Sequence, residues 1–156
     1  MKGATEKATF GGGCFWHVET AFRGVPGVVS ACVGYMGGTL ENPTYEDVCT
    51  GLTGYAEVAY VEYDPASVSY EELLDLFWQI HDPATLNRQG LDVGTQYRSA
   101  IFFHNAEQET AAKEFKEKVQ RRFGRRVVTE ITPASEFYRA EEYHQQVDLK
   151  NGLVCS

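Results

Sequence analysis

A run of three glycines near the start of the chain constrains its fold more than any other feature. Residues 7–10 have the pattern of a short strand, and residues 14–23 have the pattern of a helix. Gly11, Gly12 and Gly13 lie between them. Glycine has no Cβ to clash at positive φ, so this run allows a turn that other residues would resist. The sequence therefore predicts a strand–turn–helix unit with Cys14 in the first turn of the helix.

Cys14 is a candidate nucleophile because of this position. Unpaired backbone N–H groups and the positive end of the helix dipole gather at a helix start, and both stabilise a thiolate. Phe15 and Trp16 follow directly and suggest an apolar pocket beside the thiol. The alternative is a core cysteine packed against two core aromatic side chains, since free cysteine is among the most buried residue types. The chemistry of these residues leaves both interpretations open.

Hydrophobic spacing along the rest of the chain predicts an α+β fold. Ser69 and Glu72 form a capping box before apolar residues at helical spacing, which predicts a helix that ends before Pro83. Asn105 begins a second such helix, and Gly124 ends it. The remaining strands are expected at residues 28–35, 57–63, 99–103 and 127–131, with long loops at 37–54 and 84–97 and a short helix within 140–149.

The first six elements follow the order β-α-β-β-α-β, which is typical of a ferredoxin-like split βαβ core. A further helix and strand extend that core, and an irregular C-terminal tail follows. A chain of 156 residues is long enough for one domain with a proper core and too short for two comfortable ones. We therefore expect a single catalytic domain over residues 1–156, with a core at about 7–132 and a tail at about 133–156 that carries Cys155.

Charge and composition exclude several classes of function. The net charge of -8 disfavours nucleic acid as a general partner, because the phosphate backbone would be repelled. The one basic run, residues 121–126, is better explained as arginines that complement a helix C-terminus. No signal peptide or bilayer-spanning apolar run is recognisable, so a cytoplasmic protein without membrane contacts is expected. A monomer is also expected.

Four other residues have the chemistry that a nucleophilic Cys14 would need. Glu57 opens a predicted strand, and the two long loops contain Tyr45, Asp92 and Tyr97. A carboxylic acid with two phenols can protonate and hydrogen-bond a polarised oxygen. The alternatives are half-buried tyrosines with hydroxyls in water and a glutamate exposed at a strand edge.

The histidines and the other cysteines keep two alternative functions open. None of the four histidines is spaced from another histidine or a cysteine as metal ligands usually are, so no metal site is expected. A Cys/His metal-binding module nevertheless remains an alternative. A Cys-His hydrolase is the second, because His17 lies one helical turn after Cys14. Cys155 lies in the tail, where mobility would suit a thiol that resolves a sulfenic acid.

Several short motifs together resemble the A-type peptide methionine sulfoxide reductases. They occur in the family's order and cover the chain from about residue 10 to residue 146. They are Gly13-Cys14-Phe15-Trp16 with Glu19, Gly34-Tyr35-Met36-Gly37-Gly38, Asn42-Pro43-Thr44-Tyr45, residues 51–57, His81-Asp82-Pro83, residues 94–99 and Glu142-Tyr143-His144-Gln145-Gln146.

The resemblance implies a reaction and a role for each site residue. Cys14 would attack the sulfoxide sulfur of methionine-(S)-sulfoxide, free or in oxidised proteins, while Phe15 and Trp16 hold the methyl group. Glu57, kept protonated by desolvation, would donate to the sulfoxide oxygen. Assistance would come from Tyr45 and Tyr97, with Asp92 nearby in the pocket. The family needs no metal or organic cofactor.

The resemblance also implies how the enzyme returns to its starting state. Methionine leaves Cys14 as a sulfenic acid, a second cysteine condenses with it, and thioredoxin or another dithiol reduces the disulfide. Cys155 matches the resolving position approximately, and Cys32 or Cys49 are the alternatives. The sequence departs from the family at His17, where glycine is common, and in its short C-terminus, which lacks a glycine-rich tail.

Overall fold

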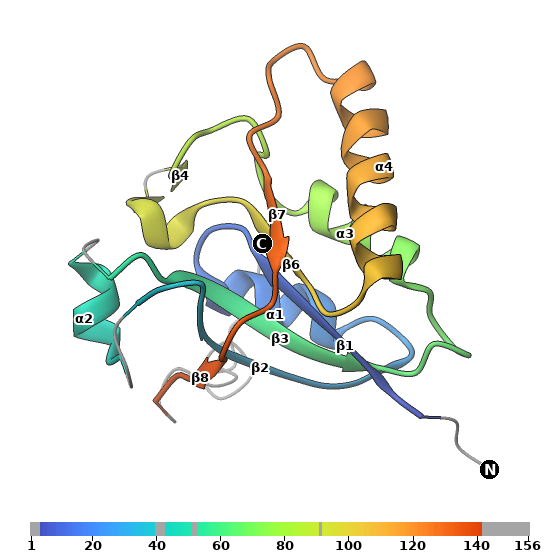
Figure 1. The fold of residues 1–156 in the computed structure, drawn as a ribbon, viewed down its shortest axis with the longest axis horizontal. Helices are drawn as coiled ribbons and strands as arrows, with labels where there is room; N and C mark the ends of the chain where they lie inside the picture. Colours follow the sequence, from blue (N-terminus) through green and yellow to red (C-terminus); the bar gives the residue numbers. More distant parts are fainter. Residues whose placement is uncertain (1–3, 40–42, 51–52, 91, 142–156) are drawn as a thin grey trace.

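The computed structural model describes residues 4–39, 43–50, 53–90 and 92–141. A six-stranded sheet with the order β7-β6-β1-β3-β2-β8 forms its centre (Figure 1). The strands of this sheet are β1 (Glu6–Gly11), β2 (Val28–Met36), β3 (Ala56–Tyr63), β6 (Ala100–Phe103), β7 (Glu130–Pro133) and β8 (Tyr138–Arg139). The helices are α1 (Phe15–Arg23), α2 (Tyr45–Cys49), α3 (Tyr70–Gln79) and α4 (Ala106–Arg122), with a 3₁₀ turn η1 (Thr95–Tyr97). A separate small hairpin joins β4 (Arg88–Gln89) to β5 (Asp92–Val93).

The strand order confirms the predicted ferredoxin-like core. β3 pairs antiparallel with both β1 and β2, so α1 connects two parallel strands that are separated by β3. β6 pairs antiparallel with the other side of β1, and α3 makes the equivalent connection from β3. α4 and β7 then extend the sheet, with β7 parallel to β6. The predicted additional helix and strand are therefore present.

A layer of aromatic side chains packs the helices against one face of the sheet. The ring of Phe10 in β1 stacks on Phe22 of α1 at a centroid distance of 4.8 Å and on Phe77 of α3 at 5.1 Å. All three side chains are fully buried. The N-terminus of α3 is fixed as predicted, because Glu72 N–H donates to the Ser69 hydroxyl at 3.1 Å.

The opposite face of the sheet is covered by the chain that follows β7. Ala134 and Phe137 pack on a cluster that contains Val58 and Phe102, and the ring of Phe137 stacks on Tyr60 at 4.5 Å. This segment crosses in front of the sheet in Figure 1 before β8 pairs with β2. The expected irregular tail from residue 133 onward is therefore wrong for residues 138–139, which form an edge strand.

Three other local predictions differ from the structure. The predicted loop at 37–54 contains the short helix α2, and the predicted loop at 84–97 contains the β4–β5 hairpin and η1. The strand expected at 127–131 begins only at Glu130, because Val127 N–H donates to Gln120 Oε1 and Val128 N–H donates to the carbonyl of Pro83. The helix expected within 140–149 lies outside the described residues, apart from its first two positions, which are not helical.

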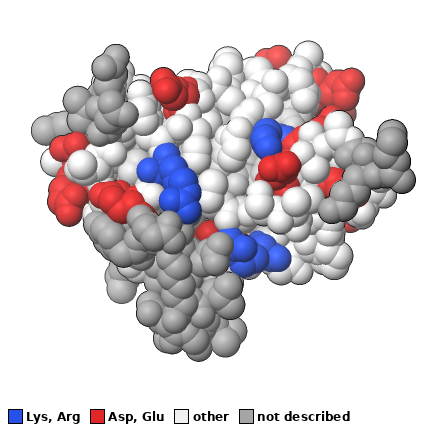
Figure 2. Space-filling model, turned by 90° about the horizontal axis from the view of Figure 1, so that it is seen from below, with Lys and Arg blue, Asp and Glu red and all other residues white. Residues whose placement is uncertain are grey.

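Surface charges are mixed in sign. On the face drawn in Figure 2, the described Lys and Arg side chains form small separate groups with Asp and Glu beside them. Arg125, from the basic run after α4, donates to Asp82 Oδ2 at 2.9 Å. Arg23 in the last turn of α1 donates to the buried Glu19 at 3.0 Å. In the described part of the chain, no helix is both long and apolar enough to cross a membrane.

Candidate active site

The glycine turn brings the end of β1 against two later segments of the chain. Gly13 has a φ of 94°, a conformation that L side chains rarely adopt. A Cβ at Gly12 would lie 3.0 Å from the ring of His81, and a Cβ at Gly13 would lie 3.0 Å from the side chain of Gln89. The turn is therefore packed directly on residues 81–89, and the close approach requires glycine.

Cys14 lies at the start of α1, as the sequence predicts, but at the N-cap position, one residue before the first helical turn. The backbone N–H groups of Trp16 and His17 favour its thiolate, but burial and the nearby carboxyl groups of Glu57 and Asp92 act in the opposite direction. Burial is the largest of these effects, and together they raise the pKa of Cys14 to about 12. The expectation of a stabilised thiolate in the resting protein is therefore wrong: Cys14 is a thiol near neutral pH.

Glu57 lies in β3 beside the start of α1 and is 1% exposed. Its Oε1 accepts a hydrogen bond from the Phe15 N–H at 3.3 Å, and its buried Oε2 has no hydrogen-bond partner among the described residues. Burial, with a smaller contribution from Asp92, raises the pKa of Glu57 to about 8, against the lowering effect of the Phe15 N–H. Glu57 is therefore mainly a neutral acid at pH 7, as expected.

Two phenols share the electrostatic environment of Glu57. Tyr45 is the first residue of α2, whose start is fixed by a capping box between Thr44 and Asp47. Burial, followed by a hydrogen bond with Cys49, raises the pKa of Tyr45, and Glu57 and Tyr97 contribute further. Burial and then Glu57 raise the pKa of Tyr97 to about 12. Both hydroxyls therefore stay protonated and can donate hydrogen bonds.

The two aromatic residues after Cys14 have different environments. Phe15 is fully buried, and its ring lies 5.8 Å from that of Tyr35 and 6.4 Å from that of Tyr45. Trp16 is half-buried, with its ring 6.5 Å from that of Phe15. Phe15 thus lies at the base of the aromatic cluster and Trp16 at its edge. The cluster offers apolar surface beside the thiol.

Asp92 reaches the site from the β4–β5 hairpin. It is exposed, and it lies opposite Gln89 in the register of the hairpin. Its charge acts on the thiol of Cys14 and on Glu57, which places all three groups in one neighbourhood. The structure therefore brings together residues from four separate segments of the chain that the sequence singled out: Cys14, Phe15, Trp16, Tyr45, Glu57, Asp92 and Tyr97.

The remaining cysteines differ in their relation to this site. Cys14, Cys32 and Cys49 are all free thiols. Cys49 is exposed and hydrogen-bonds Tyr45 at the edge of the site, whereas the charged groups that act on Cys32 are those of Arg139, Glu19, Arg23 and Lys7. Cys49 therefore shares more of its environment with Cys14 than Cys32 does, because Glu57 acts on both Cys14 and Cys49. Cys155 and His144 lie outside the described residues.

His81 and His104 are each within hydrogen-bond distance of a hydroxyl side chain. The ring of His81 contacts the carbonyl of Phe77 and the hydroxyl of Ser99, both at 2.6 Å, and burial lowers its pKa to about 4. His104 contacts Thr9 Oγ1 at 2.8 Å, and His17 is exposed on α1. Among the described residues, no three His, Cys, Asp or Glu side chains are grouped so that they could hold a metal ion.

Glu141 is a supporting residue that the sequence did not single out. Its Oε1 accepts from the Tyr35 hydroxyl and its Oε2 accepts from the Tyr45 N–H, each at 3.1 Å. It therefore ties the segment after β8 to the first residue of α2. The only signal for this role was its position next to the motif at residues 142–146.

Comparisons with known proteins agree with this geometry. A model of the family "Peptide methionine sulfoxide reductase" matches residues 6–153. The peptide methionine sulfoxide reductase MsrA of Methanothermobacter thermautotrophicus is 66% identical over 148 residues, which cover 94% of this chain and 88% of that protein. MsrA of Geobacter metallireducens is 62% identical over 154 residues, covering 97% and 95%.

Solved structures show the same fold. The reduced form of Mxr1 from Saccharomyces cerevisiae superimposes with a TM-score of 0.91 at 38% identity, covering 97% of this chain and 88% of Mxr1. Mxr1 in complex with Trx2 gives a TM-score of 0.66 at 31% identity, covering 90% and 84%. A family match over nearly the whole chain, together with these identities, shows that this protein belongs to the A-type peptide methionine sulfoxide reductases.

Proposed function

We propose that this protein reduces methionine-(S)-sulfoxide, free or in oxidised proteins, to methionine. The observation that carries the proposal is the buried, neutral Glu57 beside the Cys14 thiol, with one carboxyl oxygen bound by the Phe15 N–H and the other without a partner among the described residues. Such an acid is suited to protonating a sulfoxide oxygen, because its pKa lies near the working pH.

The chemical step takes the following form. The Cys14 sulfur attacks the sulfoxide sulfur while Glu57 protonates the oxygen, and the proton of the Cys14 thiol replaces the one that Glu57 has given. In the net step the S–O bond of the substrate breaks and an S–O bond to Cys14 forms. The sulfoxide thereby gains two electrons and becomes a thioether, while the Cys14 sulfur loses two electrons and becomes a sulfenic acid. Protonation of the oxygen makes the sulfur more electrophilic, so a thiol that is neutral at rest can be deprotonated as it attacks.

The other site residues have supporting roles in this proposal. Tyr45 and Tyr97 donate hydrogen bonds to the oxygen, since their raised pKa values keep both hydroxyls protonated. Phe15 and Trp16 hold the substrate's methyl group on apolar surface. The carboxylate of Asp92 lies at the exposed side of the pocket.

Recycling requires a second thiol and an external dithiol. Cys155 condenses with the Cys14 sulfenic acid, releasing water and forming a disulfide, and thioredoxin reduces that disulfide. The solved complex of the relative Mxr1 with Trx2 supports a thioredoxin partner. Cys49 is the better supported of the two alternatives to Cys155, because it hydrogen-bonds Tyr45 at the edge of the site.

We also propose that residues 1–156 form one catalytic domain and that the protein works in the cytoplasm. Pairing of β8 with β2 supports the first point, since it joins the segment after residue 133 to the sheet that carries Glu57. Limited proteolysis would test the domain proposal, and cell fractionation would test the location.

The function is tested with the two sulfoxide epimers and two variants. The wild type is expected to reduce the S epimer with a dithiol and to leave the R epimer unchanged. Cys14→Ser is expected to remain folded and inactive, and Glu57→Gln to lose several powers of ten in rate if its proton is in flight at the transition state. Near-normal turnover by Glu57→Gln would show that another group is the acid.

A further inference from the structure

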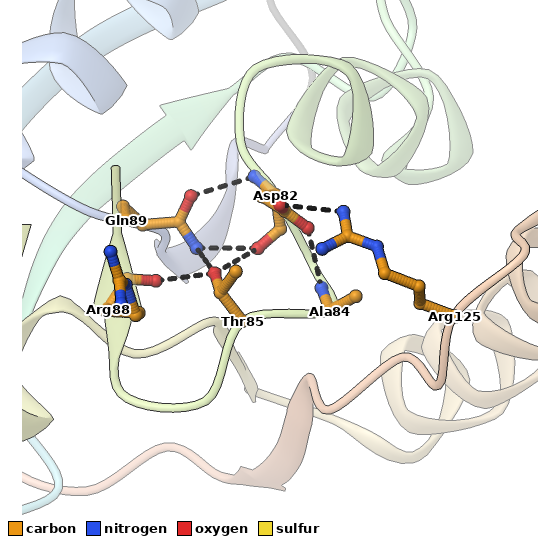
Figure 3. A network of polar contacts seen from close by, with 6 residues as sticks. All are labelled: Asp82, Ala84, Thr85, Arg88, Gln89 and Arg125. Carbon is orange, nitrogen blue, oxygen red and sulfur yellow. Dashed lines mark hydrogen bonds and ion pairs between the residues drawn. The ribbon is translucent and has the colours of Figure 1, made fainter. Parts of the chain in front are cut away.

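The side chain of Gln89 is hydrogen-bonded to both backbone groups of Asp82, seven residues earlier in the chain. Asp82 N–H donates to Gln89 Oε1 at 2.8 Å, and Gln89 Nε2 donates to the Asp82 carbonyl at 2.6 Å (Figure 3). Gln89 is half-buried and belongs to β4 of the small hairpin. Because the carboxamide accepts one hydrogen bond and donates the other, both of its polar atoms are held in place.

The side-chain carboxylate of Asp82 accepts two further hydrogen bonds. One of its carboxylate oxygens accepts from Ala84 N–H at 2.9 Å, and the other accepts from Arg125 at 2.9 Å (Figure 3). The preceding residue, His81, bonds the carbonyl of Phe77 and the hydroxyl of Ser99. The backbone of Asp82 is therefore a fixed point on the main body of the protein, and Gln89 attaches the hairpin to it.

Gln89 also lies between two parts of the site, the glycine turn before Cys14 and the strand of Asp92. A Cβ built at Gly13 would lie 3.0 Å from Cβ and from Cγ of Gln89, so the stem of Gln89 packs on the residue before Cys14. Across the hairpin, the register pairs Gln89 with Asp92. Thus the side chain of Gln89 packs on the glycine turn and is bonded to Asp82, while the backbone of Gln89 pairs with the strand of Asp92.

We propose that Gln89 is a positioning residue whose carboxamide and stem set the separation between Asp92 and Cys14 in the active site. This inference rests on the proposed function for its effect on the reaction, but its geometric part can be tested without any turnover. Asp92 acts on the electrostatics of both Cys14 and Glu57, so a hairpin that shifts changes both groups at once.

The first measurement is the alkylation rate of Cys14, followed by mass spectrometry of its peptide at a fixed pH near 9. The Asp92 charge disfavours the thiolate, so Asp92→Asn is expected to raise this rate several-fold. Gln89→Ala removes the bonds and the stem, whereas Gln89→Met keeps a similar stem and removes only the carboxamide. Both are expected to raise the rate as Asp92→Asn does, and Gln89→Ala is expected to add little when Asp92 is already Asn.

The second measurement is the single-turnover rate of sulfoxide reduction. Misplacement of a reacting group by about 1 Å can cost on the order of 100-fold in rate, so a loss of roughly 10- to 100-fold is expected for Gln89→Ala and Gln89→Met. Gln108→Ala is the matched control, because Gln108 also binds two backbone groups, Lys7 O at 2.7 Å and His104 N–H at 3.0 Å, toward the other end of β1. It is expected to lower thermal stability and to leave both rates unchanged.

The inference is overturned if Asp92→Asn alters Cys14 alkylation while both folded Gln89 variants do not. Additive effects of Gln89→Ala and Asp92→Asn would also overturn it, because the two would then act independently. Absence of sulfoxide reduction in the wild type would instead refute the proposed function, and the alkylation results would still decide the role of Gln89.

Discussion

Replacing Glu57 by glutamine should stabilise the folded protein near neutral pH, even though it removes the proposed catalytic acid. Burial raises the pKa of Glu57 from 4.5 to about 8. A carboxyl group whose pKa is raised on folding holds its proton more tightly in the folded state, so the stability that is fully present below its unfolded-state pKa falls at higher pH. For Glu57 this fall occurs as the pH rises from about 4.5 to about 8, while a neutral glutamine at the same position shows no such fall.

The size of the effect follows from the pH interval. Keeping the buried carboxyl protonated costs about 1.4 kcal/mol for each pH unit above 4.5. The cost reaches about 3 kcal/mol at pH 7 and levels off near 5 kcal/mol above pH 8. Glutamine has nearly the same shape, can accept from the Phe15 N–H and carries no charge, so it avoids this cost.

The assay is urea unfolding of wild type and Glu57→Gln at several pH values between 4.5 and 9. The variant should match the wild type near pH 4.5 and exceed it increasingly up to about pH 8. Glu19→Gln is the matched control: Glu19 is equally buried at 1% exposed, but it pairs with Arg23 at 3.0 Å, so its loss should destabilise. A free-energy difference between Glu57→Gln and wild type that does not change with pH would refute the raised pKa.

Three further predictions follow from the same structure. Phe10→Ala should cost about 3–5 kcal/mol in chemical unfolding, because the ring lies in a stack of buried aromatics, and a loss under 1 kcal/mol would contradict that packing. Gly34→Ala should detach β8, since a Cβ there would lie 2.3 Å from the carbonyl of Tyr138. Faster hydrogen exchange at the N–H of Ala140, which bonds the carbonyl of Val33, would report that detachment, and unchanged exchange would argue against it. The single-turnover rate should fall as the pH rises through about 8, where Glu57 loses its proton, whereas a fall centred near 4.5 would indicate an ordinary carboxyl.

The core of the fold could be predicted from the sequence because its signals are local. The capping box at Ser69 and the cap at Asn105 both begin the helices that they predict. The elements that were missed are short. α2 has five residues, too few for a hydrophobic period, and β4, β5 and β8 have two residues each. Such strands exist only through pairing with distant parts of the chain, which no local pattern reveals.

The candidate site, too, could be predicted only where its signals are local in the sequence. Position at a helix start correctly suggested that backbone N–H groups approach the Cys14 sulfur. It could not reveal how deeply the thiol is buried or that Glu57 and Asp92 lie nearby, and these effects reverse the direction of the pKa shift. Glu141 and Gln89 were missed for a related reason: they bond the backbone of Tyr45 and of Asp82, and no local sequence pattern indicates such bonds.

The most direct test of the central claim is one turnover without a reductant. The protein is mixed with one equivalent of methionine-(S)-sulfoxide, and methionine and free thiols are both counted. The wild type, with four cysteines, is expected to form one methionine and lose two thiols as Cys14 and Cys155 join. Cys155→Ser should still form methionine, with Cys14 left oxidised, whereas Cys14→Ser should form none and lose no thiol. Methionine formed by Cys14→Ser would contradict the account.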